Sequence, residues 1–286
     1  MQVTKREIVE RSLITSWRSR LWRPFIRAIK DYELIKSGDR IAVMMSGGKD
    51  SFLLAKLFEE LYRHGKRNFE MVLINMDPGY AEKNRAIIEE NNSLLEFTPQ
   101  MYERDVFAVT QIMDTQNPCY LCARMRRGVL YDLAKKHGCN KIALGHHYDD
   151  VIETALMNVL VGGITMAMMP KLHSTSHKNM ELIRPLYYVR EKDIINWQKS
   201  LGLSFLDCAC SIASKDLSST RRIVKELIPE LKKKFPQVEE AIFHSTRQVH
   251  TGAILGTVVK GVHHSFLESY DDDLDDNEEE KDSVYC

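Results

Sequence analysis

The sequence predicts an α/β fold, in which a parallel sheet carries helices on both faces. Short runs rich in Val, Ile and Leu alternate with longer segments whose apolar residues recur at helical spacing. The first short run ends in a turn with two adjacent glycines, Gly47 and Gly48, before a helical pattern begins. With 286 residues and 44% hydrophobic content, the chain is long enough to bury a sizeable core.

The N-terminal segment, to about residue 38, has a helical pattern and is strongly basic. Its basic residues are spread through SWRSRLWRPFIRAIKDYELI: Arg18, Arg20, Arg23, Arg27 and Lys30. Pro24 lacks the amide hydrogen that a helix interior requires, so it should break or kink this segment. We therefore expect basic helices before the sheet begins.

From residue 39 the pattern alternates between strands and helices. The predicted strands cover 40–45, 69–76 and 141–145, with a short extended piece near 94–101. The predicted helices cover 50–64, 81–95, 103–113, 122–137 and 148–161. Parallel sheets bind ligands at the carboxyl ends of their strands, so three strand ends should meet at one pocket.

After Gly163 the alternation weakens, and helical patterns return at about 190–200 and 217–250. We divide the chain into a basic helical segment (1–38), an α/β core (39–165), a C-terminal helical extension (166–265) and an acidic tail (266–286). The tail is too charged and too poor in apolar residues to pack, so we expect it to be disordered.

The formal net charge of zero conceals two parts of opposite sign. Residues 268–286 contain ten Asp or Glu and one Lys, which leaves 39 basic and 30 acidic side chains in residues 1–267. A basic body suits an anionic partner such as a nucleic acid. No apolar run approaches the roughly 20 residues that span a bilayer, and the N-terminus lacks the apolar core of a signal peptide. We therefore expect a cytoplasmic protein without a membrane segment.

The stretch SGGKDS lies between the first predicted strand and the first core helix. Glycines let a ligand approach the amides at a helix N-terminus, where the helix dipole attracts phosphate. The expected phosphate-binding loop consists of Ser46, Gly47, Gly48, Lys49, Asp50 and Ser51. The structural alternative is an ordinary glycine turn that Asp50 and Ser51 cap.

A second polar stretch, GHHYDD, follows the strand that ends KIALG. It brings Gly145 and His146 to the expected pocket and places Asp149 and Asp150 in the first turn of a helix. One of these carboxylates would hold magnesium or position the substrate. Alternatively, both only complement the helix dipole. Asp77, at the end of another strand, either contacts the nucleotide or forms the turn that follows.

Four of the six cysteines form two close pairs, Cys119 with Cys122 and Cys208 with Cys210. In a cytosolic chain such pairs indicate metal or redox chemistry rather than disulfides. The residues alone leave three roles open: structural zinc on four thiolates, an iron–sulfur cluster on three, and a persulfide carrier. A cluster with three protein ligands would leave one iron open to another group.

Three arginines, Arg124, Arg126 and Arg127, follow the first cysteine pair directly. They are either surface residues of a helix or contacts to the phosphates of a large anionic substrate. Because the body of the protein is basic, we expect them to bind RNA phosphates.

Four longer stretches carry a resemblance to a known family: DYELIKSGDRIAVMMSGGKDS, PCYLCARMRRGVLY, GHHYDDVIETALMNVLVGGITMAMMPKL and IRPLYYVREKDI. They are similar to the tRNA 2-thiocytidine synthetases of the TtcA family, a branch of the PP-loop ATP pyrophosphatases, from about residue 20 to 250. The resemblance implies a Rossmann-like fold of the adenine nucleotide alpha hydrolase type.

The activity that the resemblance implies is ATP-dependent thiolation of a cytidine in the tRNA anticodon loop. ATP and Mg²⁺ would adenylate the C2 oxygen of the base, with Lys49, Asp50 and Asp150 as the catalytic residues. The loop at 46–51 would bind the nucleotide together with Asp77, Gly145 and His146.

The resemblance also implies a 4Fe-4S cluster held by three cysteines, which we expect to be Cys119, Cys122 and Cys208. Cys210 is the alternative third ligand, because this chain has CxC where the family carries a later CxxC. The implied partners are tRNA and a sulfur donor such as a cysteine desulfurase relay, and a homodimer is compatible with the resemblance.

Two other functions remain open from the sequence. One is another PP-loop sulfurtransferase, acting on a tRNA uridine or on a small molecule. The other is a zinc-stabilised module that binds ATP and nucleic acid without catalysis.

Overall fold

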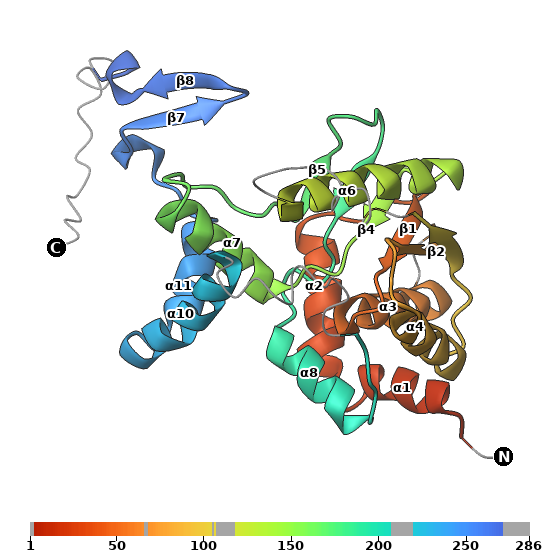
Figure 1. Ribbon diagram of the computed structural model, residues 1–286. Helices are drawn as coiled ribbons and strands as arrows, with labels where there is room; N and C mark the ends of the chain where they lie inside the picture. The colour runs from red at the N-terminus through yellow and green to blue at the C-terminus, as the bar shows by residue number, and fades with distance from the viewer. Residues whose placement is uncertain (1–2, 66–67, 105, 107–117, 207–219, 271–286) are drawn as a thin grey trace.

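The main sheet has β1 at its centre and helices on both faces (Figure 1). The protein is represented by a computed structural model that describes residues 3–65, 68–104, 106, 118–206 and 220–270. Within these residues, six strands lie in the order β3-β2-β1-β4-β6-β5. They are β1 (Arg40–Met45), β2 (Glu70–Asp77), β3 (Gln100–Glu103), β4 (Lys141–Ala143), β5 (Lys171–His173) and β6 (Glu181–Ile183). All neighbours are parallel except β5 and β6. The predicted fold class is confirmed.

The helices begin and end close to the predicted residues in the core. They are α1 (Lys5–Ile14), α2 (Arg23–Asp31), α3 (Lys49–His64), α4 (Glu82–Leu94), α6 (Pro118–Lys136), α7 (Tyr148–Leu160), α8 (Glu191–Ser200), α10 (Thr220–Lys234) and α11 (Val238–Ser245). A π-helical turn, η1 (Arg18–Trp22), precedes α2, and Pro24 lies in the first turn of α2. The backbone stays helical through Trp22 and Arg23, so no break is seen at Pro24: only the helix type changes, from π to α, just before it.

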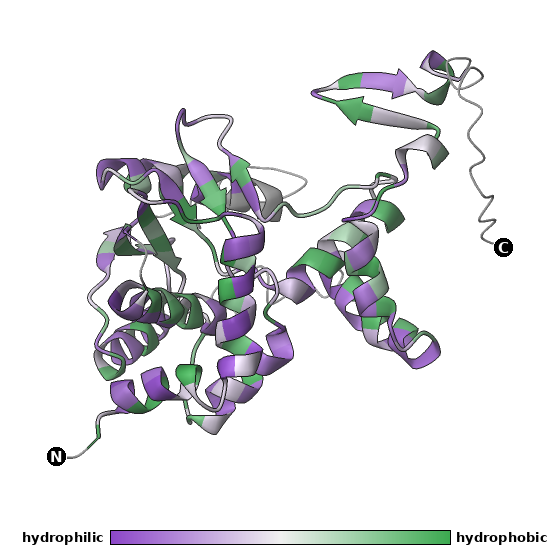
Figure 2. Cartoon of the chain, turned by 180° about the vertical axis from the view of Figure 1, so that it is seen from behind, coloured by the Kyte–Doolittle hydropathy of each residue, from purple (hydrophilic) through white to green (hydrophobic). Residues whose placement is uncertain are grey.

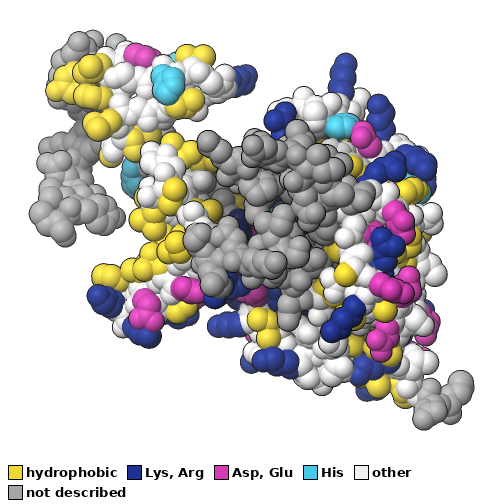
Figure 3. Space-filling view, in the orientation of Figure 1, with side chains coloured by type: hydrophobic (Ala, Val, Ile, Leu, Met, Phe, Trp, Pro, Cys, Tyr) yellow, Lys and Arg dark blue, Asp and Glu magenta, His cyan; other side chains and the backbone are white. Residues whose placement is uncertain are grey.

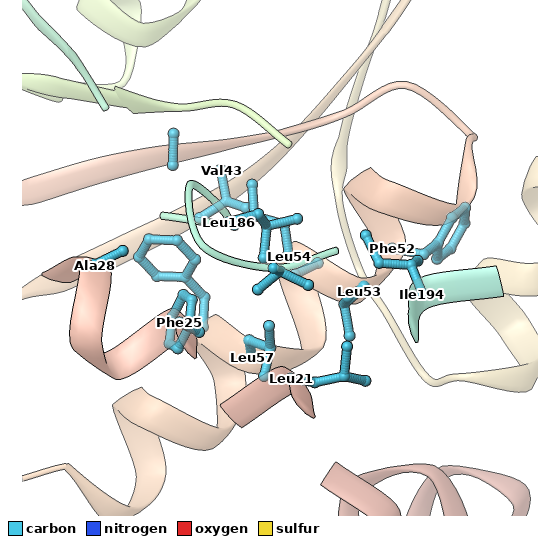
Figure 4. Close-up of a cluster of buried hydrophobic side chains, with 14 of the residues drawn as sticks. Leu21, Phe25, Ala28, Val43, Phe52, Leu53, Leu54, Leu57, Leu186 and Ile194 are labelled. Carbon is cyan, nitrogen blue, oxygen red and sulfur yellow. The ribbon is translucent and has the colours of Figure 1, made fainter. Parts of the chain in front are cut away.

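The alternation of side chains along β1 builds one core on each face of the sheet. Ile41, Val43 and Met45 point to the face covered by α2 and α3, and Figure 4 shows part of that cluster. Ala42 and Met44 point to the other face, which α6 covers. Because β1 is buried on both faces, its sequence is an unbroken apolar run after Arg40.

Several strands depart from the sequence pattern. Gln100–Glu103 pairs with β2, so the residue at which a helix was expected to begin, Glu103, ends a strand instead. The remainder of the expected helix, 107–113, lies outside the described residues. β5 and β6 extend the main sheet from a region with no predicted strand. The helical patterns at 190–200 and 217–250 correspond to α8, α10 and α11.

A two-stranded hairpin, β7 (Gly256–Val259) and β8 (Val262–Ser265), follows a short 3-10 turn at Thr251–Ala253. Lys260 and Gly261 at its tip both have positive φ, 51° and 83°, as two-residue hairpin turns require. The hairpin stands apart from the α/β body (Figure 2). It belongs to the part of the chain expected to be helical. Phe266–Glu268 forms a further 3-10 turn, and the tail beyond Tyr270 lies outside the described residues.

The division of the chain into four segments stays a prediction. Among the residues that the structure describes, no helix is both long and apolar enough to cross a membrane.

Candidate functional site

The chain crosses over beside β1, because β2 and β3 lie on one side of this strand and β4 and β6 on the other. Ligands of such sheets bind where the strand order reverses, outside the carboxyl ends of the strands. Here that position lies between the ends of β1 and β4. The SGGKDS and GHHYDD stretches begin within two residues of these strand ends, so the structure brings the two motifs together.

The loop at 46–51 is braced from several directions. The amide of Ser46 donates to Ser51 Oγ at 3.1 Å, and Ser51 Oγ donates to the Gly48 carbonyl at 2.8 Å. Tyr80 Oη donates to the Ser46 carbonyl at 3.0 Å. Gly47 has φ +82°, and a Cβ there would lie 2.7 Å from Ile88 Cγ1. The first glycine is therefore required both by the backbone and by the neighbouring helix α4.

Lys49 is the first residue of α3, and its ammonium lies between two carboxylates. Lys49 Nζ is 3.1 Å from Asp50 Oδ2 and 3.1 Å from Glu191 Oε1. Burial would lower the pKa of Lys49, but these two carboxylates outweigh it and raise the pKa. Asp50 Oδ1 is buried and has no hydrogen-bond partner among the described residues. This oxygen is therefore available to a ligand.

The GHHYDD stretch packs closely on this loop. A Cβ on Gly145 would lie 3.2 Å from the backbone carbon of Asp50, so the close approach of the two loops leaves little room for a side chain there. His147 caps α7: its backbone amide donates to Asp150 Oδ2 at 3.0 Å, and its Nδ1 faces the Asp150 amide. Asp149 accepts from the Glu191 amide at 2.6 Å and from Arg190. Asp149 thus holds the start of α8.

His146 and Asp150 face the cavity in different charge states. Burial, reinforced by Arg184, lowers the pKa of His146 to about 4, so the imidazole is neutral at physiological pH. Its buried Nδ1 has no partner in the described part of the chain. Burial would raise the pKa of Asp150, but His147, which also donates its backbone amide to this carboxylate, and Arg221 outweigh it and lower the pKa. The site therefore pairs a neutral histidine with an ionised carboxylate.

A cavity of about 370 Å³ lies beside the two loops. Its apolar lining comes from Met44, Met45, Met76, Leu130 and Leu144, and its polar lining from Ser46, Asp50, Ser51, Arg126, Arg127, Gly145, His146 and Asp150. A nucleotide needs this combination of apolar wall and anion-binding groups. A larger cavity of about 430 Å³, lined by Tyr32, Tyr187 and Arg247 among others, shares no residue with these loops.

The remaining predicted residues lie at varied distances from this cavity. Arg126 and Arg127 line it, whereas Arg124 is exposed and does not. Asp77 Oδ1 accepts from the amides of Gly79 and Tyr80, at 2.8 and 2.6 Å. These are the contacts of a turn-forming residue, and Asp77 is not part of the cavity lining.

The structure describes the backbone of the first cysteine pair and no part of the second. Cys119 and Cys122 lie in the first two turns of α6, and their side chains lie outside the described part of the structure. Cys208 and Cys210 fall in 207–219, also outside it. Among the described residues, no group of three or more His, Cys, Asp or Glu side chains is arranged to hold a metal ion.

Comparison with known proteins gives the family. The model of the PP-loop domain matches residues 20–231. The tRNA-cytidine(32) 2-sulfurtransferase of Geotalea uraniireducens is 37% identical over 257 residues, which cover 88% of this chain and 99% of that protein. The chain belongs to the PP-loop family of tRNA-cytidine(32) 2-sulfurtransferases. The Hahella chejuensis enzyme of the same name is 36% identical and covers 84% of each chain.

A solved structure of a tRNA thiolase shares the fold. The U34-tRNA thiolase NcsA from Methanococcus maripaludis, solved with its [4Fe-4S] cluster, superposes with a TM-score of 0.63 at 22% identity. The match covers 79% of this chain and 76% of NcsA. The two proteins therefore share the α/β fold.

Sequence reasoning missed several residues around the PP-loop. Glu191 contacts Lys49, Lys225 contacts Glu191 at 2.6 Å, and Arg221 contacts Asp150 at 3.1 Å. Glu191 lies in the IRPLYYVREKDI stretch that carried part of the resemblance, which was the available signal. Arg221 and Lys225 had none, because a basic helix face usually lies in solvent.

Proposed function

We propose that this protein is an ATP-dependent tRNA sulfurtransferase that converts a cytidine of the anticodon loop into 2-thiocytidine. The observation that carries the proposal is the SGGKDS loop at the crossover of the sheet, beside a cavity with an apolar wall and two arginines. The names of the relatives support a cytidine at tRNA position 32 as the target.

The cavity suits ATP. Its apolar wall, with Met44 and Met76, fits the adenine, and the start of α3, which contributes Ser51 to the lining, fits the phosphates. Lys49, the first residue of α3, does not itself line the cavity. Arg126 and Arg127 line the same cavity, so we assign them to phosphates of the nucleotide rather than to RNA alone. Arg124 remains assigned to RNA.

A magnesium ion fits the carboxylates next to Lys49. Asp50 Oδ1 is buried without a hydrogen-bond partner among the described residues, and burial, with a smaller contribution from nearby Asp150, raises the pKa of Asp50. Two carboxylates and phosphate oxygens are the ligands that Mg²⁺ prefers. Asp50 and Asp150 would hold the ion, which would neutralise charge on the departing pyrophosphate.

The reaction then has two balanced steps. The cytidine O2 attacks the α-phosphorus of ATP, the bond to the β-phosphate oxygen breaks, and pyrophosphate leaves. Sulfide adds to C2, the C2–O bond breaks, and AMP leaves with the original oxygen. A proton is lost and C2=S remains. Lys49 and the amides at the start of α3 stabilise the charge that builds on pyrophosphate in the first step.

The 4Fe-4S cluster is assigned to Cys119, Cys122 and Cys208, with Cys210 as the alternative third ligand. Two placements support this assignment. α6 carries the first cysteine pair at its start and Arg126 and Arg127 into the nucleotide cavity. Leu206, two residues before Cys208, donates its amide to the Gly47 carbonyl of the PP-loop at 3.2 Å. A cluster would supply sulfide held at a fixed distance from the activated base.

The further partners are a sulfur donor, such as a cysteine desulfurase relay, and a second copy of the chain. The hairpin supports the homodimer. Its side chains Val258, Val259 and Val262 are 54 to 60% exposed, and Figure 3 shows hydrophobic side chains gathered over this region. An isolated two-stranded hairpin is marginally stable in water, so burial against a second copy would stabilise it.

Nucleoside mass spectrometry of tRNA from a deletion strain tests the product directly. We expect 2-thiocytidine to disappear and to return with the wild-type gene, but not with Lys49→Ala. Loss of a thiouridine instead would identify another sulfurtransferase. Iron and sulfide analysis of protein purified without oxygen tests the cluster, and zinc in place of iron would support the non-catalytic module.

A further inference from the structure

Contacts among the described residues leave the Lys49 ammonium one hydrogen-bond donor for ATP. A lysine ammonium carries three N–H groups. In the structure two of them face Asp50 Oδ2 and Glu191 Oε1, both at 3.1 Å. Asp50 is the next residue along α3, whereas Glu191 comes from α8, 142 positions later. A long-range contact of this kind needs its own support.

Glu191 is held from three directions. Its backbone amide donates to Asp149 Oδ2 at 2.6 Å, and its Oε2 accepts from Lys225 Nζ at 2.6 Å. It is also the first residue of α8, where the helix dipole favours a carboxylate. Burial would raise the pKa of Glu191, but Lys225 and Lys49 lower it to about 2. The carboxylate is therefore ionised and fixed in position.

One face of α10 supports both loops of the site. Lys225 contacts Glu191, and Arg221, one helical turn earlier, contacts Asp150 Oδ1 at 3.1 Å and Glu153 Oε2 at 3.3 Å. The helix that follows the second cysteine pair thus reaches Lys49 through Glu191 and reaches Asp150 directly. Neither contact is needed to build the sheet or its two cores.

We propose that Glu191 and Lys225 are positioning residues for adenylation, which hold the Lys49 ammonium in one orientation with its third N–H free for a phosphate oxygen. This inference rests on the proposed use of ATP. It has an electrostatic cost, because Glu191 places a negative charge near the site that receives the polyphosphate. Glu191 therefore weakens ATP binding while it aligns Lys49 for the step in which charge builds on pyrophosphate.

Glu191→Gln tests whether Glu191 weakens ATP binding while it aligns Lys49. The amide keeps the size and one acceptor of the carboxylate but loses its charge. We expect KM for ATP to fall about threefold and kcat for tRNA-dependent pyrophosphate release to fall about tenfold, since a fixed orientation is lost and a repulsive charge is removed. Lys225→Met leaves Glu191 less firmly held and removes a positive charge, so kcat should fall less than in Glu191→Gln while KM for ATP rises. Lys225→Arg should restore both constants.

Matched controls are available on the same helix. Glu226, beside Lys225, pairs with Arg222 at the surface, and Lys233 pairs with Glu230; their side chains are 68% and 70% exposed. Glu226→Gln and Lys233→Met should leave both constants unchanged. A Glu191→Gln enzyme with a lower melting temperature but unchanged kcat and KM would make the contact an ordinary ion pair and overturn the proposal. A raised KM for ATP in the Glu191→Gln enzyme would also overturn the proposal.

The proposed ATP-dependent function and the positioning role of Glu191 and Lys225 can be tested separately. If the wild-type protein releases no pyrophosphate from ATP when tRNA is added, the proposed function is wrong. If it does and the Glu191 and Lys225 variants match the wild type, only the positioning role is wrong. Should Glu191→Gln fail to fold, the surface variant Lys225→Met decides, because an unchanged kcat there excludes the role.

Discussion

At the residue scale, Gly47 shows how the demands of a backbone and of a neighbour coincide. Its φ is +82°, and Ile88 of α4 occupies the space that a side chain would need. Gly38 has nearly the same φ, +84°, but no atom within 4 Å of its Cβ position. A side chain at Gly38 would meet only the strain of a positive φ, whereas a side chain at Gly47 would meet that strain and a steric clash.

Gly47→Ala should lower ATP affinity on the order of a hundredfold, because the added Cβ is strained at φ +82° and collides with the buried Ile88 side chain, so the loop and Ile88 must rearrange. Gly38→Ala should cost only about 1–2 kcal/mol of stability, the strain of a left-handed residue, and should leave ATP affinity unchanged. Equilibrium ATP binding and urea unfolding of both variants measure these effects. Equal losses of ATP affinity in the two variants would contradict the role assigned to Ile88.

His146 gives the site a defined pH response. Its pKa is about 4 in the folded protein, largely through burial and Arg184, against about 6.5 when unfolded. The unfolded state therefore binds a proton between pH 6.5 and 4 that the folded state does not, and stability falls as the pH falls through this window. Between pH 7.5 and 5.0 the loss is about 2 kcal/mol.

The test compares urea unfolding of the wild type and His146→Gln at the two pH values. The wild type should lose about 2 kcal/mol more than the variant on acidification. Burial raises the pKa of nearby Glu153 to about 7, which acts in the opposite direction in both proteins. The difference between the proteins removes that contribution. Identical pH dependence would show that His146 is not buried in its neutral form.

At the scale of elements, α8 joins the start of the chain to the PP-loop. Trp197 is fully buried, and its Nε1 donates to Ser12 Oγ of α1 at 3.1 Å. Lys5 of α1 also donates to the Leu201 carbonyl at the end of α8. These contacts fix the helix whose first residue, Glu191, faces Lys49.

Ser12→Ala should lower the free energy of unfolding by about 1–3 kcal/mol, because the buried Trp197 Nε1–H loses its acceptor. Ser245→Ala is the control: its hydroxyl donates to the Ile242 carbonyl three residues earlier, as the Ser12 hydroxyl donates to the Val9 carbonyl, but it lies at an exposed position and accepts no indole N–H among the described residues. The control should change stability by less than about 0.5 kcal/mol. Chemical denaturation of both variants measures this, and an equally small effect at Ser12 would contradict the expected anchoring.

The sequence was most informative where local pattern and burial agree. The run after Arg40 is apolar because β1 is covered on both faces, so periodicity located it correctly. β5 and β6 have three residues each and contain Lys171, His173 and Glu181, so their strand character comes from pairing with a neighbour rather than from composition. Glu103 was likewise expected in a helix, because its place in β3 depends on pairing with β2 rather than on the residue type.

Some residues of the candidate site could be found from the sequence and others could not. Glycines, Lys49 and the aspartates stand in short motifs whose spacing has a physical meaning, so the sequence located them. Glu191, Arg221 and Lys225 gain their roles only through tertiary contacts with the first half of the chain. A single charged residue on a helix carries no local sign of such a partner.

For the whole molecule, the opposite charges of body and tail predict how it binds RNA. Residues 1–267 carry nine more basic than acidic side chains, and 268–286 carry nine more acidic than basic ones. We expect tRNA affinity to fall steeply with added salt, as phosphate contacts require. Removal of residues 271–286 should raise the affinity at low salt by roughly two- to tenfold and have less effect at high salt. A tRNA affinity that does not change with salt concentration would instead indicate a small-molecule substrate.

The order of synthesis has a consequence for this architecture. Lys49 emerges from the ribosome early, but Glu191 follows 142 residues later and Lys225 another 34 after that. At roughly 5–20 residues per second, this interval lasts on the order of ten seconds or more. During that time a nascent chain displays a glycine-rich phosphate loop whose lysine lacks its distant partners. Under the positioning role proposed above, a chain whose α10 has not yet been synthesised lacks an aligned Lys49, so the ATP site is completed only late in translation.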